Sequence, residues 1–327
     1  MFVLGVAAAT PDVLLSGAQP RECAFSGSPI AGRSGVRTKR VSLPLDYIRS
    51  KGNADFLVGW SVATTTPTLL GAQAVRDVLQ RIGLSIEQIG LVLGDTGTPY
   101  QTCPSEAQRI AGEFGVKIPA YDLVGGIAAV PHMFSVVSRW STARLPEYLL
   151  YVSTNTPSQH VHYGSDPVAA GLFGDAAVVI VLGKQRAASG PSVGVAYARL
   201  RAEETRRTPI VIERSARVNT EALLSSDQLK AFIAAEMQRL QQFDATLSQK
   251  ALFIAPQLYA AEAGENLTQY GVGSQQIISG VDETGFSLGS SHGVALAKSW
   301  NALQSGQPVV LMHCGDGQCG SVVLVAA

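Results

Sequence analysis

Two stretches of the chain share a pattern and decide the fold. Residues 173–182 read Phe-Gly-Asp-Ala-Ala-Val-Val-Ile-Val-Leu, and residues 314–325 read Cys-Gly-Asp-Gly-Gln-Cys-Gly-Ser-Val-Val-Leu-Val. Each places a Gly-Asp turn before a run rich in valine, which is typical of a buried strand. The two stretches lie about 140 residues apart, whereas the repeats of a solenoid recur about every 20 to 50 residues. The pattern therefore predicts an internal duplication.

The duplication divides the chain into two halves. We place the N-terminal half at residues 1–183 and the C-terminal half at residues 184–327. Residues 184–225 are rich in Arg, Glu and Pro, so this join is predicted to consist of surface connections.

Strand-like runs alternate with helix-like segments along both halves, which predicts an α/β protein. Apolar residues at helical spacing predict a helix that ends at Ile82, before Gly83. Ser225 and Gln228 have the spacing of a capping box at the start of another helix. The other predicted elements are strands over residues 1–10, 89–93, 121–124, 149–153, 251–255 and 309–312, and helices over residues 105–114, 128–140 and 293–303.

Composition excludes some classes of function. The chain has 327 residues, with 25 basic and 25 acidic side chains and a formal net charge of zero. It therefore has no overall basic field for nucleic acid and no polybasic patch for anionic lipid. Only 15% of the residues are charged, which suits a protein that hides part of its surface in an oligomer. Neutrality still allows a small local patch to bind an acidic carrier protein.

The cysteines and the N-terminus indicate a cytoplasmic protein. Cys23, Cys103, Cys314 and Cys319 do not form a paired framework or a CxxC motif, so we expect reduced thiols. The apolar start lacks the basic first region of a signal peptide. No uninterrupted apolar stretch is long enough to span a membrane.

An ordered set of motifs resembles one family. The chain has, in order, Arg33-Ser34-Gly35-Val36-Arg37, Pro104-Ser105-Glu106-Ala107, Pro119-Ala120-Tyr121-Asp122-Leu123, Leu172-Phe173-Gly174-Asp175-Ala176-Ala177 and Gly315-Asp316-Gly317. Together they resemble the β-ketoacyl-acyl-carrier-protein synthase III enzymes, which are condensing enzymes of the thiolase type. The resemblance covers nearly the whole chain and implies two duplicated halves in a layered α-β-α-β-α arrangement.

The resemblance also implies where a catalytic triad would lie. In the family a cysteine five residues after the aspartate of the third motif attacks an acyl thioester, and here that position is Ile127. The family histidine follows a proline, and here Gln257 follows Pro256. The family asparagine corresponds to Phe286, after Gly285. A hydrocarbon side chain cannot hold a thioester, so we expect these three positions to be inactive in condensation.

The coenzyme A site implied by the resemblance is also altered. Arg33, Arg37 and Gly317 remain as candidate cofactor-binding residues. The aromatic residue expected before Arg33 is missing from residues 28–32, and Pro167 replaces an expected arginine. We therefore predict no bound cofactor, although acyl-coenzyme A or an acyl carrier protein stays possible as a partner.

Other side chains offer alternative chemistry. Cys103 lies in a loop that reaches the partner subunit in this family, so a displaced nucleophile is one interpretation and an apolar interface residue is the other. His292 and Cys314 could border the old site as a new pair, with hydrogen bonding of His292 to the backbone as the alternative. His160, His162 and Asp166 have a possible metal-binding spacing, but a surface loop is the better interpretation and we predict no metal.

Three functional hypotheses follow. The first is a non-catalytic or accessory subunit that forms a homodimer, or a heterodimer with an active ketosynthase, in fatty-acid-like or secondary-metabolite biosynthesis. The second is an acyltransferase that uses a thioester without a covalent intermediate, with Gln257 and the backbone amides of Ile127 and Gly317 polarising the carbonyl. An acyl-chain binding protein without turnover is a third class.

Overall fold

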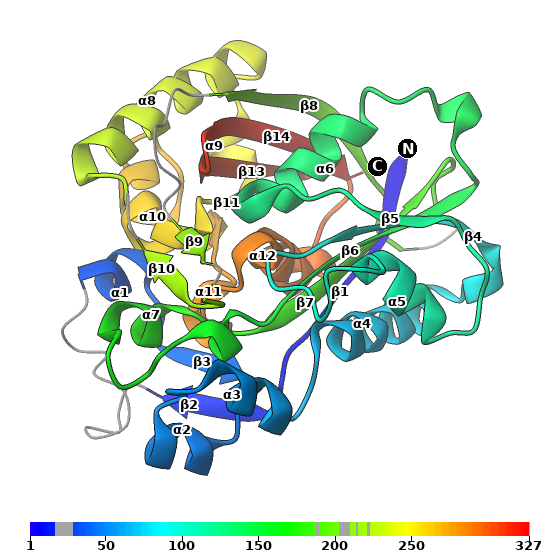
Figure 1. The fold of residues 1–327 in the computed structure, drawn as a ribbon. Coiled ribbons are helices and arrows are strands. Elements are labelled where there is room, and N and C mark those ends of the chain that lie inside the picture. Colours follow the sequence, from blue (N-terminus) through cyan, green and yellow to red (C-terminus); the bar gives the residue numbers. More distant parts are fainter. Residues whose placement is uncertain (17–28, 188–189, 203–209, 214, 221–222, 327) are drawn as a thin grey trace.

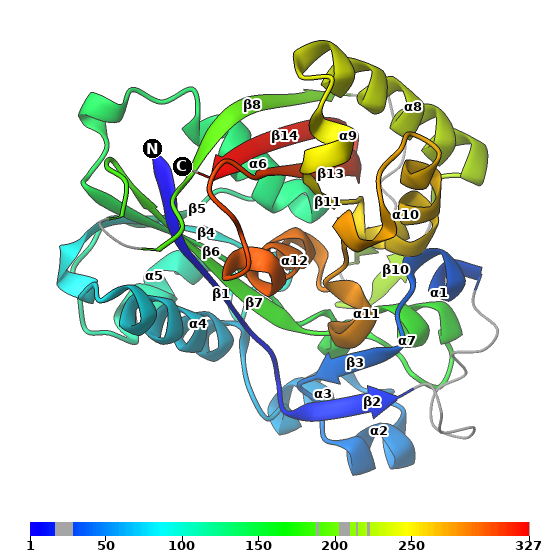
Figure 2. The same cartoon turned by 180° about the vertical axis from the view of Figure 1, so that it is seen from behind.

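The computed structural model describes residues 1–16, 29–187, 190–202, 210–213, 215–220 and 223–326. These residues contain a ten-stranded mixed sheet with the order β12-β11-β13-β14-β8-β1-β7-β6-β4-β5. The first-half strands are β1 (Phe2–Ala9), β4 (Ile89–Asp95), β5 (Ala120–Asp122), β6 (Tyr148–Asn155) and β7 (Ala176–Gly183). The second-half strands are β8 (Val193–Ala202), β11 (Leu252–Ile254), β12 (Ile277–Ile278), β13 (Pro308–Gly315) and β14 (Gln318–Ala326). Figures 1 and 2 show the sheet from opposite sides.

The strand order confirms the predicted duplication. In the first half β7 pairs antiparallel with β1 and β6, and β4 pairs parallel with β6 and β5. In the second half β14 pairs antiparallel with β8 and β13, and β11 pairs parallel with β13 and β12. The two five-stranded units therefore repeat one topology and meet where β1 pairs with β8. The boundary between residues 183 and 184 stays a prediction.

The prediction of surface connections over residues 184–225 was wrong for part of that range. β8 lies inside the sheet, between β14 and β1, because it pairs antiparallel with both strands. Later in the same range, two short strands, β9 (Ile210–Ile212) and β10 (Val218–Thr220), pair with each other. Residues 188–189, 203–209, 214 and 221–222 of the join lie outside the described residues.

Helices cover both outer faces of the sheet and fill the space between its two halves. The helices α4 (Pro67–Ile82) and α5 (Glu106–Gly112) pack on the first half, and α8 (Ser226–Phe243) and α10 (Ala260–Thr268) pack on the second. The central helices α6 (Ala129–Val137) and α12 (Ser291–Trp300) share one apolar core with strands of both halves. This arrangement confirms the α-β-α-β-α layers, and α12 is visible at the centre of Figure 1.

Local sequence signals explain where the main helices begin and end. Gly83 ends α4 with a φ of 69°, a left-handed conformation that glycine adopts without steric cost. Ser225 and Gln228 form the predicted capping box of α8. α6 is shorter than predicted, because residues Gly126–Ala128 form a 3-10 turn before Ala129 and the helix stops at Val137.

Smaller elements complete the described structure. The strands β2 (Val13–Ser16) and β3 (Thr38–Val41) form a separate two-stranded sheet. The remaining helices are α1 (Pro29–Ser34), α2 (Leu45–Lys51), α3 (Phe56–Val62), α7 (Pro167–Leu172), α9 (Leu247–Lys250) and α11 (Val281–Thr284). Within the described ranges, none of the helices has the length and apolar character needed to cross a membrane.

Candidate active site

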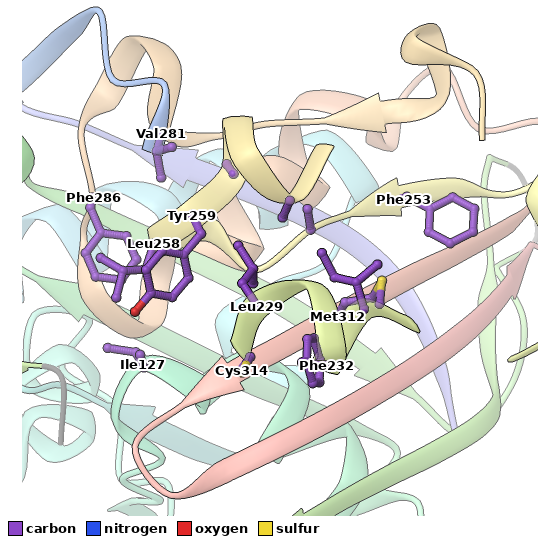
Figure 3. Close-up of a cluster of buried hydrophobic side chains, with 14 of the residues drawn as sticks. Ile127, Leu229, Phe232, Phe253, Leu258, Tyr259, Val281, Phe286, Met312 and Cys314 are labelled. Carbon is purple, nitrogen blue, oxygen red and sulfur yellow. The ribbon is translucent and has the colours of Figure 1, made fainter. Parts of the chain in front are cut away.

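The three positions expected for the triad are all buried. Ile127 lies in the 3-10 turn before α6, Gln257 follows β11, and Phe286 follows α11. Their exposed fractions are 4%, 1% and 1%. Ile127 and Phe286 belong to one apolar cluster, together with Leu258, the residue after Gln257. Figure 3 shows Ile127, Leu258 and Phe286 in this cluster.

Phe286 fills the interior between the two halves. Its ring centroid lies 6.2 Å from that of Phe173, and the rings are tilted by 48°. Its backbone N–H donates to the carbonyl of Leu172 at 2.9 Å, and its carbonyl accepts from the N–H of Gly174. Phe286 therefore packs against the Phe-Gly-Asp motif and has no polar group for a substrate carbonyl.

Gln257 uses its side chain to hold the backbone. Its Nε2 donates to the carbonyl of Ala255 at 2.8 Å, and its Oε1 accepts from the N–H of Gly280 at 2.9 Å. These bonds satisfy a buried amide without any ligand. Gln257 therefore joins the end of β11 to the segment after β12.

The backbone N–H just before α6 donates a hydrogen bond to a carboxylate. Asp316 Oδ2 accepts a hydrogen bond of 2.8 Å from the N–H of Ile127. Gly126 allows this approach, because a Cβ atom there would lie 2.5 Å from Asp316 Oδ2. Burial raises the pKa of Asp316, and the bond from Ile127 opposes that rise. The amide that a thioester oxygen would need is already bound.

Sequence reasoning did not identify Asp316 as a site residue. It lies in the turn between β13 and β14, where Asp316 has a φ of 51° and Gly317 a φ of 68°. The available signal was a charged residue inside the glycine turn of the last motif. Gly317, a candidate cofactor-binding residue, is the second of the two central residues of this turn.

A second carboxylate binds the backbone just before the 3-10 turn that contains Ile127. Asp95, at the end of β4, accepts from the N–H of Gly125 at 2.9 Å and from Ser153 Oγ at 3.0 Å. Ser153 Oγ also lies 3.1 Å from Ser290 Oγ. Burial raises the pKa of Asp95 to about 7, although these two hydrogen bonds lower it. Asp95 thus ties β4 and β6 to the start of α6 within a fully buried polar network.

The aspartates of the other motifs hold the fold. Asp175 accepts from the backbone N–H groups of Ser42 at 2.7 Å and Ser158 at 2.8 Å. Asp122 accepts from the N–H groups of Glu106 and Ala107, both at 2.9 Å, at the start of α5. Both carboxylates satisfy donors that would otherwise be unpaired inside the protein.

The alternative catalytic residues differ in exposure, since Cys103 is exposed whereas His292 and Cys314 are buried. Cys103 is an exposed thiol in the loop before α5, whereas Cys314 is buried in the cluster that contains Ile127. His292 Nε2 lies 2.9 Å from the carbonyl oxygen of Met312, and burial lowers the pKa of His292 to about 4. The ring of His313 lies 5.5 Å from that of His292, and burial lowers its pKa to about 3. Both histidines are therefore neutral near pH 7.

The candidate cofactor-binding arginines have partners within the chain. Arg33 pairs with Glu262, donates to the carbonyl of Leu224 at 2.7 Å, and stacks 4.8 Å from the ring centre of Tyr259. Arg37 is more exposed and pairs with Asp282 at 3.1 Å. Arg33 is thus directed into α10 and its neighbours rather than outward to a phosphate.

Pro167 and the histidine motif also have structural roles. Pro167 is the first residue of α7, a position that needs no backbone donor. Asp166 caps the same helix by accepting from the N–H of Ala169 at 2.8 Å. His160 Nδ1 lies 2.9 Å from the carbonyl of Ala216, and His162 Nδ1 accepts from the N–H of Ser165. Across the described segments, no group of three or more His, Cys, Asp and Glu side chains is placed to hold a metal ion.

Comparisons with known proteins agree with this fold. No protein-family model matches the chain. A β-ketoacyl-[acyl-carrier-protein] synthase III from Rhizobium meliloti is 28% identical over 150 residues, which are 45% of this chain and 46% of that protein. The enzyme of the same name from Rhizorhabdus wittichii is 26% identical over 203 residues, 62% of this chain and 56% of that protein. The matches thus span about half the length of these curated relatives.

Solved structures match over the whole chain. The 3-oxoacyl-(acyl carrier protein) synthase III of Pseudomonas aeruginosa superposes with a TM-score of 0.76 at 21% identity, covering 99% of this chain and 98% of that one. A tetronic acid condensing enzyme superposes with a TM-score of 0.76 at 19% identity, covering 99% and 100%. The chain therefore has the thiolase-type fold of the condensing enzymes, and its sequence is similar to that of β-ketoacyl-acyl-carrier-protein synthase III.

Proposed function

We propose that this chain is a ketoacyl synthase III-like protein without condensing activity that serves as a structural or accessory subunit of a dimer. The observation that carries the proposal is the start of α6, where Ile127 offers no nucleophile and its N–H is bound to Asp316. Covalent condensation needs both a thiolate and a free oxyanion donor. Neither is available at this position.

The remaining two triad positions support the same proposal. Phe286 packs against Phe173, and both polar atoms of the Gln257 side chain are hydrogen-bonded to backbone groups. Rearranging either would leave a cavity or an unpaired buried amide. The retained motif aspartates, such as Asp175, maintain the fold rather than a reaction.

A free sheet edge supports the dimer. β5 is the last strand of the ten-stranded sheet. Tyr121, on this strand, is 46% exposed and nearby Val124 is 60% exposed. Exposed strand edges with apolar side chains readily pair with another chain. The partner under this proposal is a second copy or an active ketosynthase, and each chain would contribute two halves divided near residue 183.

The acyltransferase hypothesis has less support. It uses Gln257 and the N–H of Ile127 to polarise a thioester, but both already have partners within the protein. One pocket is lined by Trp60 and Tyr100, and another is lined by Arg81 and Trp300. Neither pocket is lined by Ile127, Gln257 or Phe286. A thioester would therefore have to displace buried contacts to reach these groups.

Two measurements test the proposal. Purified protein is incubated with acetyl-coenzyme A and dodecanoyl-coenzyme A, and intact mass is compared with that of a ketoacyl synthase III whose cysteine is present. We expect an acyl adduct only on the control enzyme. An adduct on Cys103 or Cys314 would contradict the non-catalytic role. Co-expression with a tagged active ketosynthase then distinguishes the homodimer from the heterodimer, since only a heterodimer co-elutes with the tag.

A further inference from the structure

The hairpin formed by β13 and β14 carries two cysteines opposite each other. Cys314 and Cys319 are direct partners in the antiparallel register. Both are buried thiols, and they share one apolar cluster with Ile127. Figure 3 shows Cys314 on β13 near the end of the strand.

The turn fixes the geometry of this cysteine pair. Asp316 and Gly317 both have positive φ, at 51° and 68°, as the two central residues of a type I′ turn require. The closing pair, Gly315 and Gln318, is then the hydrogen-bonded one, so the next pair along the strands is non-hydrogen-bonded. Side chains of such a pair lie on the same face of the hairpin.

The expected separation suits a covalent link. Residues of a non-hydrogen-bonded pair have Cα atoms about 4.5 Å apart, and disulfides join Cα atoms about 4.4–6.8 Å apart. Bridging Cys314 and Cys319 therefore requires side-chain rotation without separation of the strands.

We propose that Cys314 and Cys319 are a modification site at which a peroxide forms a reversible disulfide. The Cys314 thiolate attacks one peroxide oxygen, which gives a sulfenic acid and releases water after protonation. The Cys319 thiol then attacks the sulfenic sulfur, the S–S bond forms, and a second water leaves. Both thiols are oxidised, the peroxide is reduced, and a dithiol reverses the reaction.

The disulfide would act on the contact at the start of α6. Cys314 and Cys319 flank the four-residue turn that contains Asp316, and the turn residues are partly exposed, which gives a small oxidant a route to the pair. A covalent link at the base of this turn restricts the movement that would withdraw Asp316 from Ile127. This inference goes beyond the proposed function, because it requires neither a partner nor the absence of condensation. The disulfide and the proposed function can therefore each be disproved without affecting the other.

Mass spectrometry tests the disulfide directly. No Lys or Arg follows Lys298, so trypsin leaves both cysteines on one peptide, residues 299–327. The folded chain is treated with hydrogen peroxide, blocked with a thiol reagent, digested and analysed. We expect this peptide to lose about 2 Da and to escape blocking, and dithiothreitol to reverse both changes. Hydrogen exchange of the segment that contains Ile127 should slow at least about twofold on oxidation.

Matched variants make the result decisive. Cys314→Ser and Cys319→Ser should each abolish the mass loss and the change in exchange, whereas Cys103→Ser should retain both. Exposed Cys103 reports whether the oxidant was effective in the wild-type chain. If Cys103 is oxidised while peptide 299–327 keeps its reduced mass, or gains about 32 Da as a sulfinic acid, the proposal is overturned.

Discussion

Asp316 Oδ2 lies 2.8 Å from the backbone nitrogen of Ile127 and accepts its hydrogen. The first N–H groups of a helical segment have no partner within that segment, and they attract negative charge. In this chain the acceptor comes from the β13–β14 turn, which lies 189 residues further along the sequence. The contact joins the two halves of the fold and removes a donor that a ligand could otherwise use.

Shortening Asp316 should expose that donor. Asp316→Gly keeps a residue that tolerates positive φ but has no acceptor, whereas Asp316→Asn tolerates the same backbone and keeps a carbonyl oxygen. We expect hydrogen exchange at Ile127 to accelerate about tenfold in the glycine variant, equivalent to about 1.4 kcal/mol of lost protection, and less in the asparagine variant. Asp77→Gly, on the exposed face of α4, serves as the control. Equal exchange in all four proteins would show that the contact gives no protection.

The same carboxylate should suppress a thiol placed at Ile127, the position that we propose to correspond to the family's nucleophile. A negative charge nearby raises the pKa of a thiol, whereas the N-terminus of a helix lowers it. We therefore expect Ile127→Cys to react slowly with iodoacetamide at pH 7, and the addition of Asp316→Gly to raise the rate at least about tenfold, as one pKa unit would. Adding Asp316→Asn removes the charge and keeps the side-chain volume.

Labelling at the introduced thiol is read by peptide mass, with exposed Cys103 as an internal reference. A rate that is the same with aspartate, asparagine and glycine at position 316 would rule out this electrostatic effect.

Sequence patterns predicted most of the fold because its elements obey local rules. Gly83 ends α4 and Ser225 caps α8 as predicted. The paired Gly-Asp stretches correctly indicated the duplication, since they precede the corresponding strands β7 and β14. β8 was missed because most of its side chains are only partly buried or exposed, which resembles a surface loop. Its place is fixed by pairing with β14 and β1, which are distant in sequence.

The candidate site was harder to predict, because contacts rather than residue types define it. The register pointed to Ile127 and Phe286 as site positions, and both lie in one apolar cluster. It gave no sign that Asp316 binds the N–H of Ile127 or that Gln257 holds Gly280. Such bonds depend on the packing of loops from both halves, which no local pattern encodes.

Asp95 should make stability depend on pH. Its pKa is about 7 in the folded chain and near the ordinary value of 3.8 in the unfolded chain. The folded state thus binds the proton more tightly, so this contribution is favourable below pH 4 and is lost as the pH rises to 7. We expect Asp95→Asn to gain about 2–3 kcal/mol relative to wild type between pH 5 and pH 8, on the order that the shift implies.

Urea unfolding at the two pH values measures this difference, because the other titrating groups are common to both proteins and cancel. Asp77→Asn provides a matched exposed control with no expected change. An Asp95→Asn curve that stays parallel to wild type from pH 5 to pH 8 would show that Asp95 is ionised in the folded state.

The exposed edge at β5 predicts a charge-sensitive dimer. Tyr121 is 46% exposed and Val124 is 60% exposed. If Tyr121 or Val124 is changed to lysine, the same lysine from each of the two chains would face the other across the paired β5 edges. Like charges placed opposite each other on paired strands are destabilising. We expect Tyr121→Lys and Val124→Lys to weaken self-association at least about tenfold, which corresponds to about 1.4 kcal/mol. Light scattering after gel filtration, over a range of protein concentrations, measures the shift.

Leu14→Lys, on β2 and 46% exposed, is the control and should leave the mass unchanged. If the lysine variants at β5 keep the wild-type mass at every concentration, this edge does not form the interface, and a different surface must be sought.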